Sequence, residues 1–371
     1  MPSSPHETRR LLHVFSTFAV GGAQVRFCTL AARFGSGWHH DIVAMDGNLA
    51  CRERLAPGVS VGFPAIEHRK GDTLGNVRRF RRALRALRPD VLATYNWGTI
   101  EWAMANALVR LPHVHIEDGF GPEERARQLP RRVFTRRLFL RRATVVLPSR
   151  TLERIATTVW RLPRAQVRYL PNGIDLARFA AALEPAADGP VIGTVAALRA
   201  EKNLARLLHA FSLLRRDRAA RLVIVGDGPE RPALEALAGA LGIADAVRFA
   251  GHMAAPERAY RGFDLFALTS DTEQMPLSVL EAMAASLPVV ATDVGDVAAM
   301  LAEENRPFVT PPDPAALAGA MARLLDDPAL ARRLGAANRA RAEREFDEAA
   351  MVRAYAALFG ARPGVAAGAG A

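Results

Sequence analysis

Residues 264–294, DLFALTSDTEQMPLSVLEAMAASLPVVATDV, contain the pattern that decides the fold. Apolar runs at 264–268 and 288–291 flank a short acidic segment and a helix-like stretch. This order predicts strand, loop, helix and strand, the repeating unit of a parallel sheet. Glu273 would then lie in a loop at the carboxyl end of a strand, and Glu281 would lie in the following helix. Ligands of open α/β sheets bind at that edge, so the two carboxylates could hold the hydroxyls of a sugar and of a ribose.

Strand-like and helix-like stretches alternate along the whole chain, which predicts an α/β protein with parallel sheets covered by helices on both faces. Strands are predicted at 11–16, 40–45, 59–63, 91–94, 113–117, 144–147, 167–170, 191–195, 221–225, 247–250, 265–268, 289–292 and 307–309. One doubly wound sheet built from 371 residues would be unusually wide, so two domains are expected. The predicted domains are 1–176 and 177–344, because no strand or long helix is readable between 172 and 190, and the tail 361–371 is expected to be disordered.

The composition is that of a globular protein in a reducing compartment. Half of the residues are hydrophobic and 23% are charged, and the longest apolar runs have the length of strands, not the roughly 20 residues of a membrane span. No signal-peptide pattern is present at the N-terminus. Cys28 and Cys51 provide neither a disulfide framework nor a zinc spacing, so a cytoplasmic location is expected and both thiols are assigned to packing.

The net charge of +11 is concentrated in two arginine-rich stretches. Arg78–Arg88 contains six arginines, Arg125–Arg142 contains eight, and neither contains an acid. Two interpretations are open: ordinary surface helices, or a surface that rests on an anionic membrane or holds an acidic acceptor. Nucleic acid is not expected as a partner, because no helix-turn-helix, zinc-finger or aromatic RNA-binding pattern accompanies the charge.

Two loops that follow predicted strands carry groups suited to an anionic ligand. Gly21 and Gly22 end the first strand, and paired glycines let backbone amides approach an anion at a helix N-terminus, although a plain tight turn is an equal alternative. Lys202 is placed at the start of the helix after strand 191–195, with Arg199 in the same loop. An ammonium group and a helix dipole both favour a phosphate there; the alternative is a pair of solvent-exposed charges.

A third loop is rich in glycine and a fourth is rich in acids. Gly226 opens the turn GDGP, which allows the close approach of a nucleotide or serves as structural punctuation, with Pro229 suited to the first turn of a helix. Asp271 and Glu273 could chelate a metal that binds a diphosphate. Lys202 and two helix N-termini can neutralise a diphosphate without a cation, so no metal and no cofactor are predicted.

Taken together, these motifs resemble the retaining GT-B glycosyltransferases of family 4. The matching motifs are PNGID (171–175), EKN (201–203), VIVGDGPE (223–230), V-x-F-x-G (247–251), and E-x7-E (273–281) with LEAMAASLPVVATDVG around its second acid. They span the C-terminal half in order, and the N-terminal Gly-Gly loop agrees. The resemblance implies a GT-B fold, in which two Rossmann-like domains face each other across a cleft and a final helix at 345–360 packs back on the first domain.

The resemblance also implies a glycosyl (hexosyl) transfer reaction and the residues that support it. A nucleotide-diphosphate-sugar donor would bind the C-terminal domain, with Glu273 on the sugar, Glu281 on the ribose and Lys202 on the leaving phosphate. The other implied donor-binding residues are Gly21, Gly22, Arg199, Gly226, Gly251, His252, Met253, Met275, Pro276 and Leu277. The acceptor would be a glycan or a lipid-linked glycan, in cell-surface polysaccharide or glycolipid synthesis at the inner face of the cytoplasmic membrane.

Three positions depart from the pattern of the family. Gln274 follows the first acid where members often have glycine, which puts the shape of the sugar pocket in question. Ala197 occupies the position of the usual arginine, and Arg199 is the candidate that replaces it. After the fifth strand, Asp118 stands where many relatives have a histidine; it is predicted to touch the donor sugar or the acceptor hydroxyl, with His115 as the alternative.

Two other functions remain open at this point. A nucleotide-sugar 2-epimerase has the same fold and would convert its own donor without an acceptor, but the E-x7-E loop and the basic N-terminal half argue against it. A nucleotide-sugar-binding module that has lost activity would be consistent with the altered arginine and histidine positions. Reaction with and without an acceptor distinguishes all three.

Overall fold

A computed structural model describes residues 8–120, 124, 127–180 and 189–360. The chain divides into two compact units, unit 1 (Met1–Pro171 with Ala350–Ala371) and unit 2 (Asn172–Ala349). The changeovers lie near the predicted residues 176 and 345 but not at them. Ile174 forms a β-bridge with Asp347 and its amide donates to the carbonyl of Phe346, so the segment after Pro171 belongs to unit 2. The predicted tail at 361–371 lies outside the described residues.

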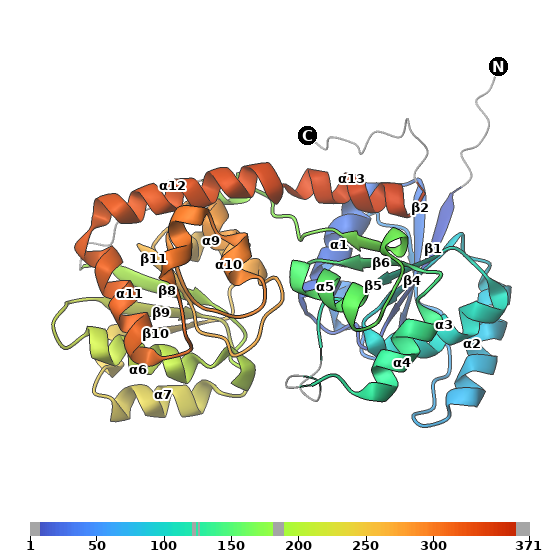
Figure 1. Cartoon of the computed structure of the whole chain (residues 1–371), viewed down its shortest axis with the longest axis horizontal. Coiled ribbons are helices and arrows are strands. Elements are labelled where there is room, and N and C mark those ends of the chain that lie inside the picture. Colours follow the sequence, from blue (N-terminus) through green and yellow to red (C-terminus); the bar gives the residue numbers. More distant parts are fainter. Residues whose placement is uncertain (1–7, 121–123, 125–126, 181–188, 361–371) are drawn as a thin grey trace, which may run out of the picture. The chain divides into compact units, whose positions relative to one another are not determined.

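Unit 1 contains a parallel sheet in the strand order β3-β2-β1-β4-β5-β6-β7 (Figure 1). Its strands are β1 (Arg9–Phe15), β2 (Trp38–Ala44), β3 (Val61–Gly62), β4 (Val91–Tyr95), β5 (His113–Ile116), β6 (Thr144–Leu147) and β7 (Val167–Tyr169). Its helices are α1 (Gly22–Phe34), α2 (Thr73–Leu87), α3 (Ile100–Val109), α4 (Pro130–Phe139), α5 (Arg150–Thr158) and α13 (Glu348–Leu358). Helix α13 comes from the far end of the chain, and its Val352 and Tyr355 pack in the same core as Leu11 and Phe27.

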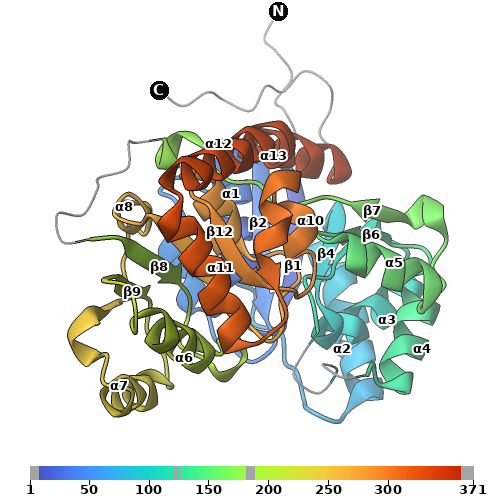
Figure 2. The ribbon, with the colours of Figure 1, turned by 60° about the vertical axis from the view of Figure 1, so that its left-hand side comes forward.

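Unit 2 contains a second parallel sheet in the order β10-β9-β8-β11-β12-β13. Its strands are β8 (Val191–Val195), β9 (Arg221–Val225), β10 (Val247–Gly251), β11 (Leu265–Leu268), β12 (Val289–Thr292) and β13 (Val309–Thr310). Its helices are α6 (Leu204–Leu214), α7 (Arg231–Ala240), α8 (Glu257–Tyr260), α9 (Leu277–Ala284), α10 (Val297–Met300), α11 (Pro314–Asp326) and α12 (Pro328–Glu345). Helices α6 and α7 lie next to each other on the same side as α11, whereas α8, α9 and α10 cover the other face (Figure 2).

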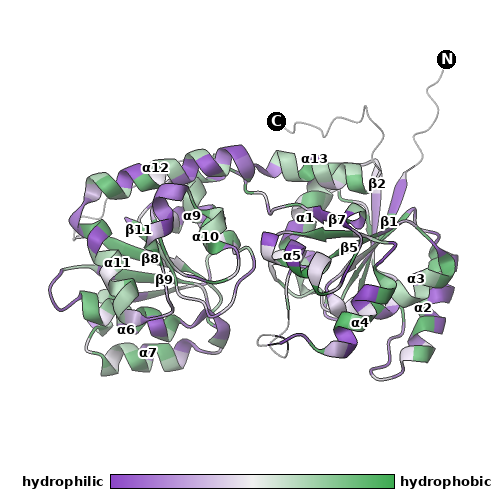
Figure 3. Cartoon of the chain, in the orientation of Figure 1, coloured by the Kyte–Doolittle hydropathy of each residue, from purple (hydrophilic) through white to green (hydrophobic). Residues whose placement is uncertain are grey.

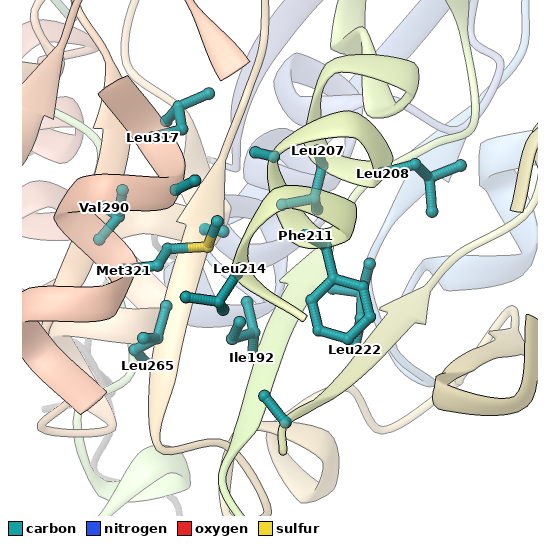
Figure 4. Packing of buried hydrophobic residues seen from close by; sticks show 14 of the residues in the cluster. Ile192, Leu207, Leu208, Phe211, Leu214, Leu222, Leu265, Val290, Leu317 and Met321 are labelled. Carbon is teal, nitrogen blue, oxygen red and sulfur yellow. The ribbon is translucent and has the colours of Figure 1, made fainter. Parts of the chain in front are cut away.

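The apolar strands of unit 2 bury both of their faces, as expected for a parallel sheet. Leu265 faces α6 and α11, whereas its neighbour Phe266 faces α9. The helices carry hydrophilic residues beside hydrophobic ones, which matches elements with one solvated side (Figure 3). On the buried side, Phe211 of α6 and Met321 of α11 pack over Ile192 of β8 (Figure 4).

Every predicted strand has a counterpart, and the predicted architecture of two parallel-sheet α/β domains is confirmed. Several strand boundaries differ from the prediction by one or two residues, and at the last strand the reason is clear. Residues 307 and 308 belong to a 3-10 helix (Glu303–Phe308) and not to the last strand. The buried Asn305 side chain exchanges two hydrogen bonds with the backbone of Val289, so an amide group takes the place of strand pairing there. Within the described part of the chain, no helix is both long and apolar enough to cross a membrane.

Candidate active site

The predicted donor residues of unit 2 lie at the carboxyl edge of its sheet. The strand order reverses between β8 and β11, and such a switch point is where open α/β sheets bind ligands. The loop after β8 carries Arg199 and Lys202, and the loop after β11 carries Glu273. Two segments that are 71 positions apart in sequence therefore meet at this one point of the edge.

Lys202 and Glu273 form an ion pair at the switch point. The Lys202 ammonium donates to Oε1 of Glu273 at 2.5 Å, and the Ser270 hydroxyl donates to the same oxygen at 2.8 Å. Both side chains keep some solvent exposure, 25% for Lys202 and 10% for Glu273. Lys202 lies in a 3-10 turn just before α6 and not in its first turn, because Asn203 caps that helix with its side chain.

A second set of polar side chains fixes the two loops to each other. Arg206 of α6 donates to Asp271 at 2.7 Å and to the carbonyl of Thr269 at 2.8 Å, and the Asn203 amide also donates to Asp271, at 3.0 Å. Asp271 is therefore the partner of a guanidinium group in this structure. Within the described residues, no three His, Cys, Asp or Glu side chains are placed to share a metal ion.

Two glycines allow backbone segments to approach at this edge. Gly295, which follows β12, has φ +56°, and a Cβ there would lie 2.1 Å from the Glu273 carbonyl oxygen. Gly226 has φ +132°, and a Cβ there would lie 1.9 Å from the Ala196 carbonyl oxygen. The close packing of the loops after β8 and β9 therefore requires a glycine at position 226. Contact between Gly226 and a ligand stays a prediction.

The other donor residues predicted for unit 2 lie around the same edge. Gly251 ends β10, the side chains of His252 and Arg199 are exposed, and Met253 is partly buried. Within the described residues no ion pair involves Arg199, so its guanidinium is available to an anion. Pro229 precedes α7, but Pro232 and not Pro229 occupies the first turn of that helix.

The start of α9 brings the remaining donor residues together. Met275 is buried, and its carbonyl accepts from the Asn172 side chain at 3.2 Å. Pro276 caps α9 and Leu277 begins it, which leaves the first amides of the helix without partners inside the helix. One turn later the Tyr260 hydroxyl donates to Oε2 of Glu281 at 2.6 Å. Burial raises the pKa of Glu281, and the Tyr260 hydrogen bond offsets only part of this effect.

In unit 1, Asp118 and the Gly21–Gly22 loop also lie at the carboxyl edge of the sheet, near the point where the strand order reverses between β1 and β4. Gly21 caps α1 and Gly22 begins it. Asp118 follows β5, and both of its carboxylate oxygens accept from Arg26 of α1, at 2.6 and 2.9 Å. The Asp118 side chain is 20% exposed, so a ligand can still reach it.

The structure places His115, the alternative to Asp118, inside the molecule. The side chain is fully buried, and its ring nitrogens lie 2.8 Å from the Thr94 hydroxyl and 3.3 Å from Glu117. Glu117 accepts in turn from the buried Arg136 at 3.1 Å. Because His115 has no exposed surface, the geometry favours Asp118 as the group that meets a ligand.

Comparisons with known proteins give the family. Residues 177–341 match the family Glycosyl transferases group 1, and residues 20–178 match Glycosyltransferase Family 4. EpsF from Bacillus subtilis (strain 168), which is named as a glycosyltransferase, is 30% identical over 315 residues, or 77% of this chain and 79% of that protein. The crystal structure of HepE from Anabaena in complex with UDP has a TM-score of 0.79 at 19% identity, over 94% of this chain and 98% of that one. The chain belongs to the GT-B glycosyltransferases.

Two further relatives match only part of their own length. An alpha-D-kanosaminyltransferase from Streptomyces kanamyceticus is 38% identical over 152 residues, which are 40% of this glycosyltransferase and 39% of that protein. A lipopolysaccharide core biosynthesis glycosyltransferase, LpsD from Rhizobium meliloti, is 37% identical over 139 residues, 37% of this chain and 40% of its own. These enzymes differ in what their names say they act on, so the comparisons give the class of reaction and not the acceptor.

The arginine-rich stretches of this glycosyltransferase are only partly surface. Arg78–Arg88 lies on and just after α2, whose Phe80 and Leu84 are buried while most of its arginines face outward. In the second stretch, residues 125 and 126 lie outside the described residues, and Arg136 is not a surface residue at all: it is 1% exposed and pairs with Glu117 and Glu124.

Proposed function

We propose that this glycosyltransferase is a family 4 member that moves a sugar from a nucleoside-diphosphate sugar to a glycan or lipid-linked acceptor, with retention of configuration and without a metal. The observation that carries the proposal is the Lys202–Glu273 pair at the switch point of unit 2. A cation and a carboxylate side by side suit a donor that has an anionic diphosphate joined to a neutral sugar with many hydroxyls.

Lys202 has donors to spare for the diphosphate. An ammonium group has three N–H donors, and Glu273 takes one of them, so two can reach phosphate oxygens. In the transfer, the bond from the sugar C1 to the diphosphate oxygen breaks and a bond from C1 to the acceptor oxygen forms on the same face. The acceptor proton passes to the leaving phosphate oxygen. Lys202 stabilises the charge that develops on that phosphate, which is usually the largest contribution in such sites.

Glu273 and Glu281 hold the two ends of the donor in this proposal. Ser270 and Lys202 orient the Glu273 carboxylate, which keeps oxygen lone pairs for sugar hydroxyls. Tyr260 holds one Glu281 oxygen in place, and the other oxygen can accept from a ribose hydroxyl. HepE, whose structure contains UDP, supports a nucleotide donor for a chain of this fold.

The decisive experiment is incubation of the full chain with a panel of nucleotide sugars, with and without extract of bacterial membranes. Release of nucleotide only in the presence of acceptor, with the anomeric configuration of the product matching that of the donor by NMR, supports the proposal. Conversion of the donor without acceptor would indicate a 2-epimerase, and binding without turnover would indicate a binding module. Loss of activity in EDTA would contradict the absence of a metal.

We also propose that unit 1 rests on an anionic membrane surface at the inner face of the cytoplasmic membrane, where a lipid-linked acceptor is reached. Phe134 and Leu138, one turn apart on α4, are 62% and 50% exposed and are flanked by exposed arginines. Leu74 on α2 is 75% exposed, and α2, α3 and α4 are neighbours. Apolar side chains among cations suit a surface with acyl chains beneath anionic headgroups.

Sedimentation with phosphatidylglycerol vesicles tests this second proposal. The triple substitution Arg81→Gln, Arg82→Gln and Arg85→Gln is expected to weaken binding by up to about 100-fold, because each basic residue near the surface contributes on the order of 1 kcal/mol. The matched control removes the same charge from unit 2, at Arg332, Arg333 and Arg344. If both triple variants lose vesicle binding equally, or neither loses it, the arginines of α2 are ordinary surface charges and the second proposal is contradicted.

A further inference from the structure

We propose that Arg26 is a positioning residue for Asp118: it holds the Asp118 carboxylate in one orientation, as a fixed acceptor for a hydroxyl of a sugar. This inference rests on the proposed function, because it gives Asp118 the sugar-contacting place in unit 1. Arg26 itself matched no motif in the sequence. The two residues are 92 positions apart, and they meet only because β1 and β5 flank β4 in the sheet.

Three neighbouring strands build this arrangement. Arg26 lies in the second turn of α1, which follows β1, and it donates to both oxygens of Asp118. Asn96 follows β4, and its side-chain oxygen accepts from the backbone amide of Asp118 at 2.7 Å. Asn96 has φ +59° with ψ 166°, and a positive φ is uncommon for a residue with a side chain. Both the backbone and the carboxylate of Asp118 are therefore fixed by residues from other segments.

The burial of Arg26 shows why the pair must stay charged. The Arg26 side chain is 5% exposed, and an unpaired guanidinium in the interior would cost several kcal/mol. Burial lowers the pKa of Arg26, but the charge of Asp118 and the hydrogen bonds between them more than reverse the effect, and the net direction is upward. The bidentate guanidinium also fixes the plane of the Asp118 carboxylate.

Two buried tyrosines also lie beside the pair. Tyr95 of β4 and Tyr355 of α13 interact electrostatically with Arg26, and burial raises the pKa of both, that of Tyr355 to about 12. The Arg26 guanidinium also lies over the Tyr355 ring, 5.8 Å from its centre. Both tyrosines are thus neutral at physiological pH and do not compete with Asp118 for the charge of Arg26.

The Asp118 carboxylate can therefore bind Arg26 and a ligand at the same time. Each Asp118 oxygen accepts one N–H of Arg26, and a carboxylate oxygen has a further lone pair. The Asp118 side chain is 20% exposed, so those lone pairs can accept from a hydroxyl. A histidine at this place could donate or accept, whereas the carboxylate only accepts.

The test compares Arg26→Lys and Arg26→Gln with the wild-type chain. Arg26→Gln is expected to lower kcat about tenfold or more, because the Asp118 carboxylate loses the guanidinium that fixes its orientation. Arg26→Lys keeps the charge but not the bidentate fork, so it is expected to restore only part of kcat. The donor KM should stay within about twofold in both variants, since Lys202, Glu273 and Glu281 are unchanged.

A second readout makes the inference independent of turnover. The carboxyl signal of Asp118, identified with Asp118→Asn in a chain labelled with 13C-aspartate, is compared between the wild type and Arg26→Gln at pH 7, and it is expected to shift when the guanidinium is removed. Arg33→Gln, at an exposed arginine in the last turn of the same helix, is the charge-matched control. Thermal unfolding is measured for all variants.

The outcomes separate this inference from the proposed function. If the wild type transfers no sugar but the Asp118 signal still shifts in Arg26→Gln and not in Arg33→Gln, the proposed function fails and the carboxylate clamp stands. If Arg26→Gln lowers only the unfolding temperature, with kcat and the Asp118 carboxyl signal both unchanged, Arg26 is merely structural and the inference is overturned.

Discussion

Unit 1 and unit 2 have the same layered architecture but differ in where their charged side chains lie. In unit 2 most buried side chains are apolar, and the charged groups of the site lie at the edge of the sheet, in loops (Lys202, Asp271, Glu273) and on helices (Arg206, Glu281). In unit 1 charged and titratable side chains extend into the interior. The buried members of this set are His13, Arg26, His40, Asp41, His113, His115, Glu117, Glu124 and Arg136.

In unit 2 the charged residues of the candidate site lie apart from the apolar core, whereas in unit 1 charged residues are part of the interior. In unit 2 a charge can be removed from the edge without disturbing the apolar core beneath it. In unit 1 Glu117 and Glu124 share Arg136, and Asp118 next to Glu117 is held by Arg26. Changes of protonation are therefore expected to lower the stability of unit 1. In unit 2 they are expected mainly to change ligand binding at the candidate site.

The largest expected effect is on turnover, from Glu273→Gln in unit 2. The substitution keeps the size of the side chain but removes the charge that pairs with Lys202 and the acceptor for sugar hydroxyls. We expect kcat to fall by on the order of 10²- to 10³-fold, with little change in the thermal unfolding temperature. Initial rates of nucleotide release measure this, with Glu304→Gln, at an exposed acid of the same unit, as the control. Near-normal turnover would remove Glu273 from the site.

The sequence predicted the architecture of unit 2 and the position of its candidate residues at the edge of the sheet, because these residues follow strands within short segments. The strand before Glu273 and the helix after it are readable from apolar runs, so its position at the edge follows directly. Arg206 was not predictable as a partner of Asp271. A basic residue on an amphipathic helix has the same pattern whether it faces solvent or another loop.

The site of unit 1 was harder to predict for a physical reason. Alternation in β5 shows that His113 and His115 share one face, but in a parallel sheet both faces are buried, so alternation does not tell a ligand-facing side chain from an interior one. The pairing of Arg26 with Asp118 depends on the order of the strands, which no local pattern contains. Reading Arg136 as a surface charge failed because its acidic partners lie in another segment.

The second expected effect is that unit 1 loses stability at acid pH whereas unit 2 does not. Burial lowers the pKa of His40 to about 4 and that of His113 to about 3, and it lowers the pKa of His13 as well. Because these folded-state values lie below the unfolded value of about 6.5, the unfolded state takes up protons first as the pH falls. Stability is therefore lost between about pH 6.5 and 4, by about 2–3 kcal/mol for His40 alone.

Hydrogen exchange measured by mass spectrometry at pH 7 and pH 5 checks this, after correction for the intrinsic exchange rate. Peptides from β1 and β2 should lose protection at pH 5, whereas peptides from β8 and β9 should keep theirs, since the histidines of unit 2, His209 and His252, are exposed. His209→Gln serves as the control and should leave both profiles as in the wild type. Equal loss in the two units would mean that the buried histidines do not set the acid response.

The smallest effect on stability and turnover is expected from Glu281→Gln. Glu281 belongs to unit 2, but its carboxyl group is largely buried, as the interior acids of unit 1 are. Burial raises the pKa of Glu281, so folding favours the protonated carboxyl group. The resulting stabilisation is present below the pKa of the unfolded state, and it is lost as the pH rises through the pKa of the folded state. At neutral pH the ionised group is thus a small cost to folding, and a neutral amide that still accepts from Tyr260 should unfold at the same temperature or slightly higher. The donor KM should nevertheless rise about tenfold, because a charged acceptor for the ribose is lost. A lower unfolding temperature with an unchanged KM would reverse both parts of this expectation, and would show that the Glu281–Tyr260 pair stabilises the packing of α9 and does not bind the donor.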